Sequence, residues 1–107
     1  MEIREIQILK QNTDNIECEV CIGNVAKEVL AEARSKTGYN RPRLYMCGIY
    51  DISHKSLAFQ KIGEGIYLYT RGDRGQVVPL KHTIQPQSIE QITEITISNL
   101  NKRIEQG

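Results

Sequence analysis

The chain has 107 residues and a formal net charge of +1, with 39% hydrophobic and 25% charged residues, which is typical of one compact globular domain. A charge this close to neutral excludes binding of nucleic acid through overall basicity, so any such binding requires a local basic patch. No apolar run approaches the roughly 20 residues that span a bilayer, and the charged residues 2–5 do not resemble a signal peptide. We therefore predict a single domain, residues 1–107, in the cytoplasm and away from membranes.

Two strands are expected at the start of the chain. Residues 2–10 and residues 16–22 alternate apolar and polar side chains, a period of two that is typical of strands with one buried face. The cluster of turn-forming residues between them predicts a hairpin. In the second strand, Glu17 and Glu19 then lie on the outward face, an acidic surface that nucleic acid would avoid.

A helix and two more strands are expected in the middle of the chain. Asn24 is placed to cap a helix whose apolar residues recur at helical spacing as far as Gly38, a residue suited to ending it. The continuous apolar run of residues 44–52 predicts a central strand buried on both faces, with Gly48 as the position of a bulge. Residues 57–62 predict a shorter strand.

A hairpin is expected between residues 65 and 80. Two runs rich in β-branched and aromatic residues flank a loop with two glycines, which reach the positive φ angles that a tight reversal needs. The loop carries Arg71 and Arg74, and the incoming strand carries Tyr67 and Tyr69. Alternation along a strand predicts that these two tyrosines share a face.

The last segment of the chain is ambiguous between a helix and a strand. Ser88 and Gln91 have the spacing of a capping box, and apolar residues recur at helical spacing as far as residue 104. The β-branched run at residues 92–98 also favours a strand. We expect a helix because the helical pattern continues past this run and agrees with the capping residues.

These elements, in the order β-β-α-β-β-β-β-α, predict an α+β domain. Strands that follow one another without intervening helices form a largely antiparallel sheet. We expect this sheet to be curled into a small pseudo-barrel, with the two helices flanking it.

Two groups of residues suggest chemistry, and each has a simpler structural explanation. Cys18 and Cys21 have the Cys-x-x-Cys spacing of zinc and redox sites, but positions three apart on a strand point to opposite faces. We therefore expect free thiols, no metal site and no cofactor. His54 and His82 are candidate acid–base groups, yet nothing in their spacing requires catalysis, so we expect a protein that is not an enzyme.

Positive charge and tyrosines gather between residues 39 and 82 of the chain. All five tyrosines lie between residues 39 and 69, and basic residues outnumber acidic ones from residue 41 to residue 82. Arginines beside tyrosines can bind phosphates and stack bases, which suits single-stranded or structured RNA. The candidate RNA-binding residues are Arg41, Arg43, Tyr67, Tyr69, Arg71, Arg74, Lys81 and His82.

The chain as a whole resembles the small PrgU-like proteins of Gram-positive conjugative plasmids. The resemblance lies in the order of the elements and in residues 20–31, 39–48 and 63–80. It implies a PUA-like fold, a curled β-barrel with flanking helices, and a regulatory role through RNA binding. It assigns no individual site residue.

The expected function is therefore non-catalytic, post-transcriptional regulation through RNA, with conjugation genes as the implied target. Two alternatives stay open. One is a protein-interaction module or homodimer without nucleic-acid binding, formed through the isoleucine-rich C-terminal helix or a strand edge. The other is a small ribonuclease that uses His54 or His82.

Overall fold

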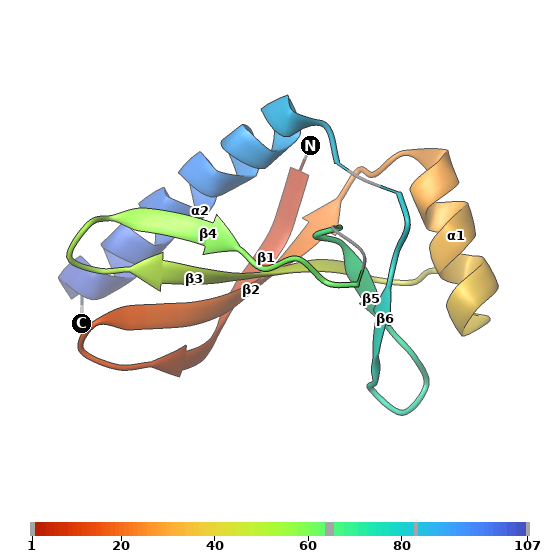
Figure 1. The fold of residues 1–107 in the computed structure, drawn as a ribbon, viewed down its shortest axis with the longest axis horizontal. Coiled ribbons are helices and arrows are strands. Elements are labelled where there is room, and N and C mark those ends of the chain that lie inside the picture. Colours follow the sequence, from red (N-terminus) through yellow and green to blue (C-terminus); the bar gives the residue numbers. More distant parts are fainter. Residues whose placement is uncertain (1, 64–65, 83, 107) are drawn as a thin grey trace.

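The structure, a computed structural model, describes residues 2–63, 66–82 and 84–106. It is an α+β domain with an antiparallel sheet of six strands and two helices (Figure 1). In chain order the elements are β1 (Glu2–Gln11), β2 (Asn15–Gly23), α1 (Lys27–Thr37), β3 (Leu44–Asp51), β4 (Ser56–Phe59), β5 (Tyr69–Arg71), β6 (Val77–Pro79) and α2 (Pro86–Gln106). The predicted fold class is confirmed.

The sheet is organised around β3. One edge of β3 pairs with β2 along its whole length, whereas the other edge pairs with β4 near its end and with β5 near its start. β6 continues the sheet from β5, and β1 continues it from β2. The sheet does not close into a barrel, because no pairing joins β1 to β6 in the described part of the chain.

The core lies between one face of the sheet and α2, which runs along that face (Figure 1). The alternating residues of β2 supply buried side chains from the sheet, and α2 supplies Ile92, Thr96 and Leu100. The buried Tyr50 of β3 donates a hydrogen bond from its hydroxyl to Oδ1 of Asn101. The helix expected across residues 92–98 is therefore confirmed. It is stabilised here because its apolar side packs against the sheet.

α1 lies at the other end of the sheet, beside the hairpin of β5 and β6 (Figure 1). The expected capping of this helix by Asn24 is wrong. Asn24 has a left-handed φ of 52°, and the helix begins at Lys27 after Ala26, which makes no side-chain cap. The expected end is confirmed: Gly38, with φ of 78°, donates its backbone N–H to the carbonyl of Arg34.

The expected bulge at Gly48 is also wrong. The register between β2 and β3 runs through Gly48 without a break, and the register shifts of the sheet lie in β1 instead. A Cβ atom at Gly48 would come 3.0 Å from Cδ1 of Phe59 and 3.1 Å from Cδ1 of Leu57. The glycine therefore makes room for the side chains of β4, a close approach rather than a bend.

The outward acidic face expected for β2 is covered in part. Glu19 is only 6% exposed, because the side chains of β5 lie over this face of the sheet.

Among the described residues, no helix is both long and apolar enough to cross a membrane.

Candidate nucleic-acid interface

A pocket of about 200 Å³ lies where the segment before β3 meets the end of β5. We call it the arginine pocket. It is lined by Tyr39, Arg41, Pro42, Arg43, Tyr45, Arg71 and Gly72. Three of the predicted RNA-binding residues, Arg41, Arg43 and Arg71, therefore come together here from two separate parts of the chain.

Pairing between β3 and β5 brings these two parts together. Tyr45 pairs with Tyr69 and Leu44 pairs with Thr70. The buried Thr70 also donates its hydroxyl to the carbonyl oxygen of Arg43 at 2.8 Å. The backbone that carries Arg43 is thereby joined to the strand that ends at Arg71.

Arg71 is held in place by a buried carboxylate on β2. Its Nη2 donates to Oε2 of Glu19 at 2.5 Å, and the side chain of Glu19 is only 7% exposed. The same oxygen accepts a hydrogen bond from the hydroxyl of Tyr69. A second donor group of Arg71, Nη1, bonds the carbonyl of Gly75 at 3.2 Å.

The pKa values of Tyr69 and Arg71 are both shifted in the direction that keeps their hydrogen bonds to Glu19 at neutral pH. Burial, together with the hydrogen bond to Glu19, raises the pKa of Tyr69 above its usual range, so its hydroxyl stays protonated and donates. Burial alone would lower the pKa of Arg71, but the bond to Glu19 outweighs it and the pKa is raised. Arg71 therefore stays charged.

The guanidinium of Arg71 also packs on two tyrosine rings. Its carbon lies 5.4 Å from the ring centre of Tyr45 and 5.8 Å from that of Tyr69. The two rings are 5.7 Å apart and tilted by 32°. These distances are within the range of cation–π contacts. Arg71 and Tyr45 thus form a fixed wall of the pocket, and Tyr39, which is 40% exposed, also lines it.

Arg41 and Arg43 supply the accessible charge of the pocket. Both side chains are exposed. Arg41 has no carboxylate within 4.0 Å among the described residues, and Arg43 has only Glu5 at 3.7 Å, in a pair that is more than half exposed on both sides. Exposed pairs of this kind contribute little. These two guanidinium groups are therefore available to a ligand.

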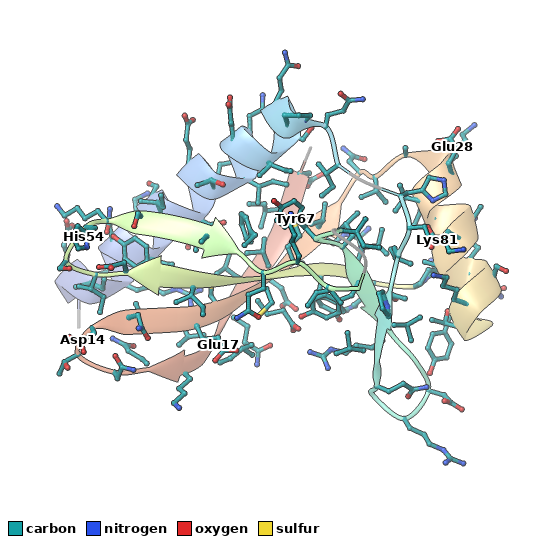
Figure 2. The ribbon with its side chains drawn as sticks, viewed as in Figure 1. Asp14, Glu17, Glu28, His54, Tyr67 and Lys81 are labelled. Atoms are coloured by element: carbon teal, nitrogen blue, oxygen red, sulfur yellow. The ribbon has the colours of Figure 1, made fainter. Side chains whose placement is uncertain are left out.

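Tyr67 and Tyr69 do not belong to one regular strand, in contrast to the expectation. β5 begins only at Tyr69, so the alternation of a regular strand does not extend back to Tyr67. Tyr69 is 3% exposed and points to Glu19, which leaves no ring surface for a base. Tyr67 is half-buried against the core and lies near the middle of the molecule (Figure 2).

The other predicted cations lie outside the pocket. Arg74 is exposed in the turn that follows the pocket residue Gly72. Lys81 lies beside α1 (Figure 2), where the backbone N–H groups of Lys81 and His82 donate to the carboxylate of Glu32. The ring of His82 also contacts Glu32, at 2.6 Å.

The residues considered for other chemistry are dispersed. His54 lies in the turn between β3 and β4 with Asp51, at the opposite end of the molecule from Lys81 (Figure 2). Cys18 belongs to the core, and Cys21 pairs with Tyr45 on the other face of β2. Within the described ranges, no group of three or more histidine, cysteine or acidic side chains could hold a metal ion.

Sequence reasoning missed Tyr39, Tyr45 and Glu19 as members of the site. Tyr39 and Tyr45 flank the two predicted arginines at a spacing of two residues, a signal that could have included them. Nothing in the sequence indicates that Glu19 meets Arg71, because 52 residues separate them.

No protein-family model, curated protein or solved structure matches this chain. The resemblance to PrgU-like proteins therefore stays a prediction. The observations that bear on function are the α+β fold and the arginine pocket.

Proposed function

We propose that this protein is a non-catalytic RNA-binding regulator that acts in the cytoplasm and holds an unpaired nucleotide of its RNA in the arginine pocket. One observation carries the proposal: three guanidinium groups from two distant segments converge on one small pocket beside Tyr39 and Tyr45. The overall charge of the chain is only +1, so this local concentration of arginine is a specific feature.

The pocket has the chemical groups that a nucleotide needs. Guanidinium forks bind phosphate oxygens through two parallel hydrogen bonds, and Arg41 and Arg43 are accessible for this. A tyrosine ring or an arginine plane can stack a base, and Tyr39 and the Arg71–Tyr45 wall offer both. The volume of about 200 Å³ is below the roughly 300 Å³ at which ligand pockets begin, so the pocket encloses part of one nucleotide, a base or a phosphate, rather than a larger ligand.

Unpaired RNA fits this arrangement better than a duplex. The bases of an RNA duplex are stacked inside it and its major groove is too narrow for side chains. A pocket walled by aromatic rings requires a base that has left the stack. The regulatory role, and a plasmid-borne origin with conjugation genes as targets, rest on the resemblance to PrgU-like proteins.

The test is a binding titration with labelled single-stranded RNA of random sequence, followed by fluorescence anisotropy at about 50 and 200 mM salt. The test variant is Arg41→Ala/Arg43→Ala. The matched control is Lys10→Ala/Lys102→Ala, which removes the same charge from exposed positions outside the pocket. Both pairs are exposed, so both variants are expected to fold.

We expect the unaltered protein to bind RNA, with an affinity that falls as salt increases. The double arginine variant should bind at least about tenfold more weakly. Its plot of log affinity against log salt should be shallower by about 1.4, or 0.7 for each lost contact to a single-stranded phosphate. The lysine control should match the unaltered protein.

Absence of binding at low salt, or equal binding by the two double variants, would overturn the proposal. The same samples are run on a denaturing gel, because intact RNA is expected. Cleavage that is lost on His54→Ala or His82→Ala would establish the ribonuclease alternative instead.

A further inference from the structure

The arginine pocket has a buried base and an exposed, positively charged rim. Pro42 is the buried residue of its lining, and the arginines on either side of it in the chain, Arg41 and Arg43, are exposed. Gly72 lines the pocket from the other segment and adds no side chain. A group that enters the pocket therefore meets a proline at the base and guanidinium groups around it. This suits the end of a chain better than a segment that must enter and leave.

The charges of the pocket favour a ligand with more than a single negative charge. Glu19 pairs with Arg71 and so neutralises one of the guanidinium groups. Among the described residues, Arg41 has no carboxylate within 4.0 Å, and the pair between Arg43 and Glu5 is exposed and therefore weak. A phosphodiester within RNA carries a single negative charge, whereas a phosphomonoester at an end carries about 1.5 to 2 at pH 7. The monoester balances the pocket more completely.

The hydrogen-bond donors of the pocket lead to the same choice. A phosphomonoester presents three free oxygens, one more than a diester. Arg41 and Arg43 can each direct a fork of two N–H groups at these oxygens. Arg71 uses Nη2 on Glu19 and Nη1 on the carbonyl of Gly75, and an arginine has more N–H groups than these two bonds use. Its guanidinium is therefore fixed in orientation and still able to donate.

We propose that the arginine pocket binds the phosphomonoester at an end of the RNA, so that the protein recognises RNA with a phosphorylated end. This inference rests on the proposed function and deepens it, because the nucleotide that is held becomes the terminal one. Its phosphate lies among the arginines, and its base stacks on the exposed ring of Tyr39. A 5′-phosphate and a 3′-phosphate share this chemistry, and the test distinguishes them.

The test is a competition experiment in which unlabelled oligonucleotides of one sequence displace the labelled random RNA from the protein. Three forms are compared: one with hydroxyl groups at both ends, one with a 5′-phosphate and one with a 3′-phosphate. We expect a phosphorylated form to compete about tenfold better than the hydroxyl form at about pH 7.5, since it adds about one charge-assisted hydrogen bond. The better competitor identifies the end that the pocket binds.

The preference should also depend on pH. The second pKa of a phosphomonoester is about 6, so at about pH 5 its charge approaches that of a diester and the preference should shrink toward equality. The arginines stay charged across this range. Tyr45 stays protonated, because burial raises its pKa although Arg43 acts to lower it. The hydroxyl form, measured at each pH, corrects for groups outside the pocket such as His82.

The variant Arg41→Ala removes one of the two guanidinium groups that Glu19 does not neutralise. It should reduce the preference from about tenfold to about threefold, and Arg41→Ala/Arg43→Ala should abolish it. The matched control is Arg74→Ala, which removes the same charge from an exposed position close to Gly72 and outside the pocket. This control should leave the preference for a phosphorylated end unchanged.

The outcomes separate this inference from the proposed function. If the three forms compete equally while Arg41→Ala/Arg43→Ala still weakens RNA binding, the inference is wrong and the proposed function stands. If a phosphorylated end is preferred but Arg41→Ala leaves that preference unchanged, the end binds elsewhere and the inference is again wrong. If no form of the RNA binds at low salt, both fail.

Discussion

Nη2 of Arg71 donates a hydrogen bond of 2.5 Å to Oε2 of Glu19, across 52 residues of the chain. The carboxylate is almost completely covered, and the arginine is 39% exposed. Glu19 therefore binds the Nη2 group of the guanidinium. The exposed part of the Arg71 side chain stays at the pocket. This arrangement fixes the arginine before any ligand arrives, which lowers the entropic cost of binding.

The first prediction concerns what the pair contributes to stability. Arg71→Ala removes the ion-pair partner of the almost fully covered Glu19 and leaves Tyr69 as its remaining partner, so it should lower the free energy of unfolding. Because Arg71 is partly exposed, we expect a loss near the lower end of the roughly 3 to 5 kcal/mol typical of broken buried pairs. Urea denaturation followed by circular dichroism measures it.

Arg74→Ala is the matched control for this prediction, since Arg74 is exposed in the same turn. It should change the free energy of unfolding by no more than about 0.5 kcal/mol. Equal stability of the two variants would show that Glu19 does not depend on Arg71. Because Arg71 supports the fold, Arg41 and Arg43 are the better positions at which to test RNA binding.

The sequence predicted the elements well where local patterns decide them. The period of two in residues 16–22 matches β2, and the helical pattern beyond residue 86 matches α2. The low helix propensity of the β-branched residues of α2 is offset because Ile92 and Thr96 are buried against the sheet. The strands expected for the hairpin are shorter than predicted, three residues each. A pattern of residue types indicates that a segment is extended, but not how far it stays paired.

The site was predictable only in part, because distant pairing creates it. Charge alone singled out Arg41, Arg43 and Arg71, but only the pairing of Tyr45 with Tyr69 places them around one pocket. The alternation of β2 indicates which residues share a face with Glu19. It does not indicate that the side chains of β5 cover that face. Tyr69 consequently looked like a surface residue and is instead buried.

The second prediction concerns the contact between the sheet and α2. Tyr50 is fully buried on β3, and its hydroxyl donates to Asn101 on α2. Tyr50→Phe keeps the ring and removes the hydrogen bond, so the free energy of unfolding should fall by about 0.5 to 1.5 kcal/mol. Thermal and urea denaturation measure the loss.

Asn101→Ala in the background of Tyr50→Phe provides the control for that pair. Once the hydroxyl is absent, removal of Asn101 should cost less than it does in the unaltered protein, and the difference is the coupling between the two residues. Additive effects of the two substitutions would contradict a direct hydrogen bond.

The third prediction concerns the cysteines. All three described thiols are buried and none is in a disulfide. Burial, with a smaller effect of the nearby Cys47, raises the pKa of Cys18 to about 11, and burial also raises the pKa of Cys21 and of Cys47. Since the thiolate is the reactive form, native protein at neutral pH should not react with iodoacetamide over hours.

Mass spectrometry measures the number of labels on the intact chain. Protein unfolded in urea should carry three labels under the same conditions, one for each cysteine of the chain, which shows that the reagent is active. Rapid labelling of any one cysteine in the native protein would contradict a purely structural role for that residue.

The last prediction concerns the pH dependence of the contact between α1 and the segment after β6. Glu32 accepts hydrogen bonds from the backbone N–H groups of Lys81 and His82 and forms an ion pair with Lys36 at 2.9 Å. Burial acts to raise the pKa of Glu32, but the bonds from Lys81, Lys36 and His82 together outweigh it and lower the pKa from 4.5 to about 2. In the unfolded chain these partners are absent.

A carboxyl group whose pKa is lower in the folded state stabilises the fold above its unfolded pKa, and this contribution is lost as the pH falls toward the folded pKa. The stabilisation by Glu32 should therefore be complete at neutral pH and disappear between about pH 4.5 and pH 2. Glu32→Gln removes the charge, so the difference in melting temperature between the two proteins should be largest at neutral pH and shrink across that range.

Asp51 also has a pKa lowered to about 2, through hydrogen bonds from the His54 backbone and the side chains of Ser53 and His54, so the unaltered protein loses stability in acid for more than one reason. The comparison between Glu32→Gln and the unaltered protein isolates the part that Glu32 contributes, because Asp51 is present in both. Glu28→Gln, at an exposed position of the same helix (Figure 2), is the matched control and should melt like the unaltered protein. A difference between Glu32→Gln and the unaltered protein that stays constant from neutral pH into acid would show that Glu32 acts through packing rather than through its charge.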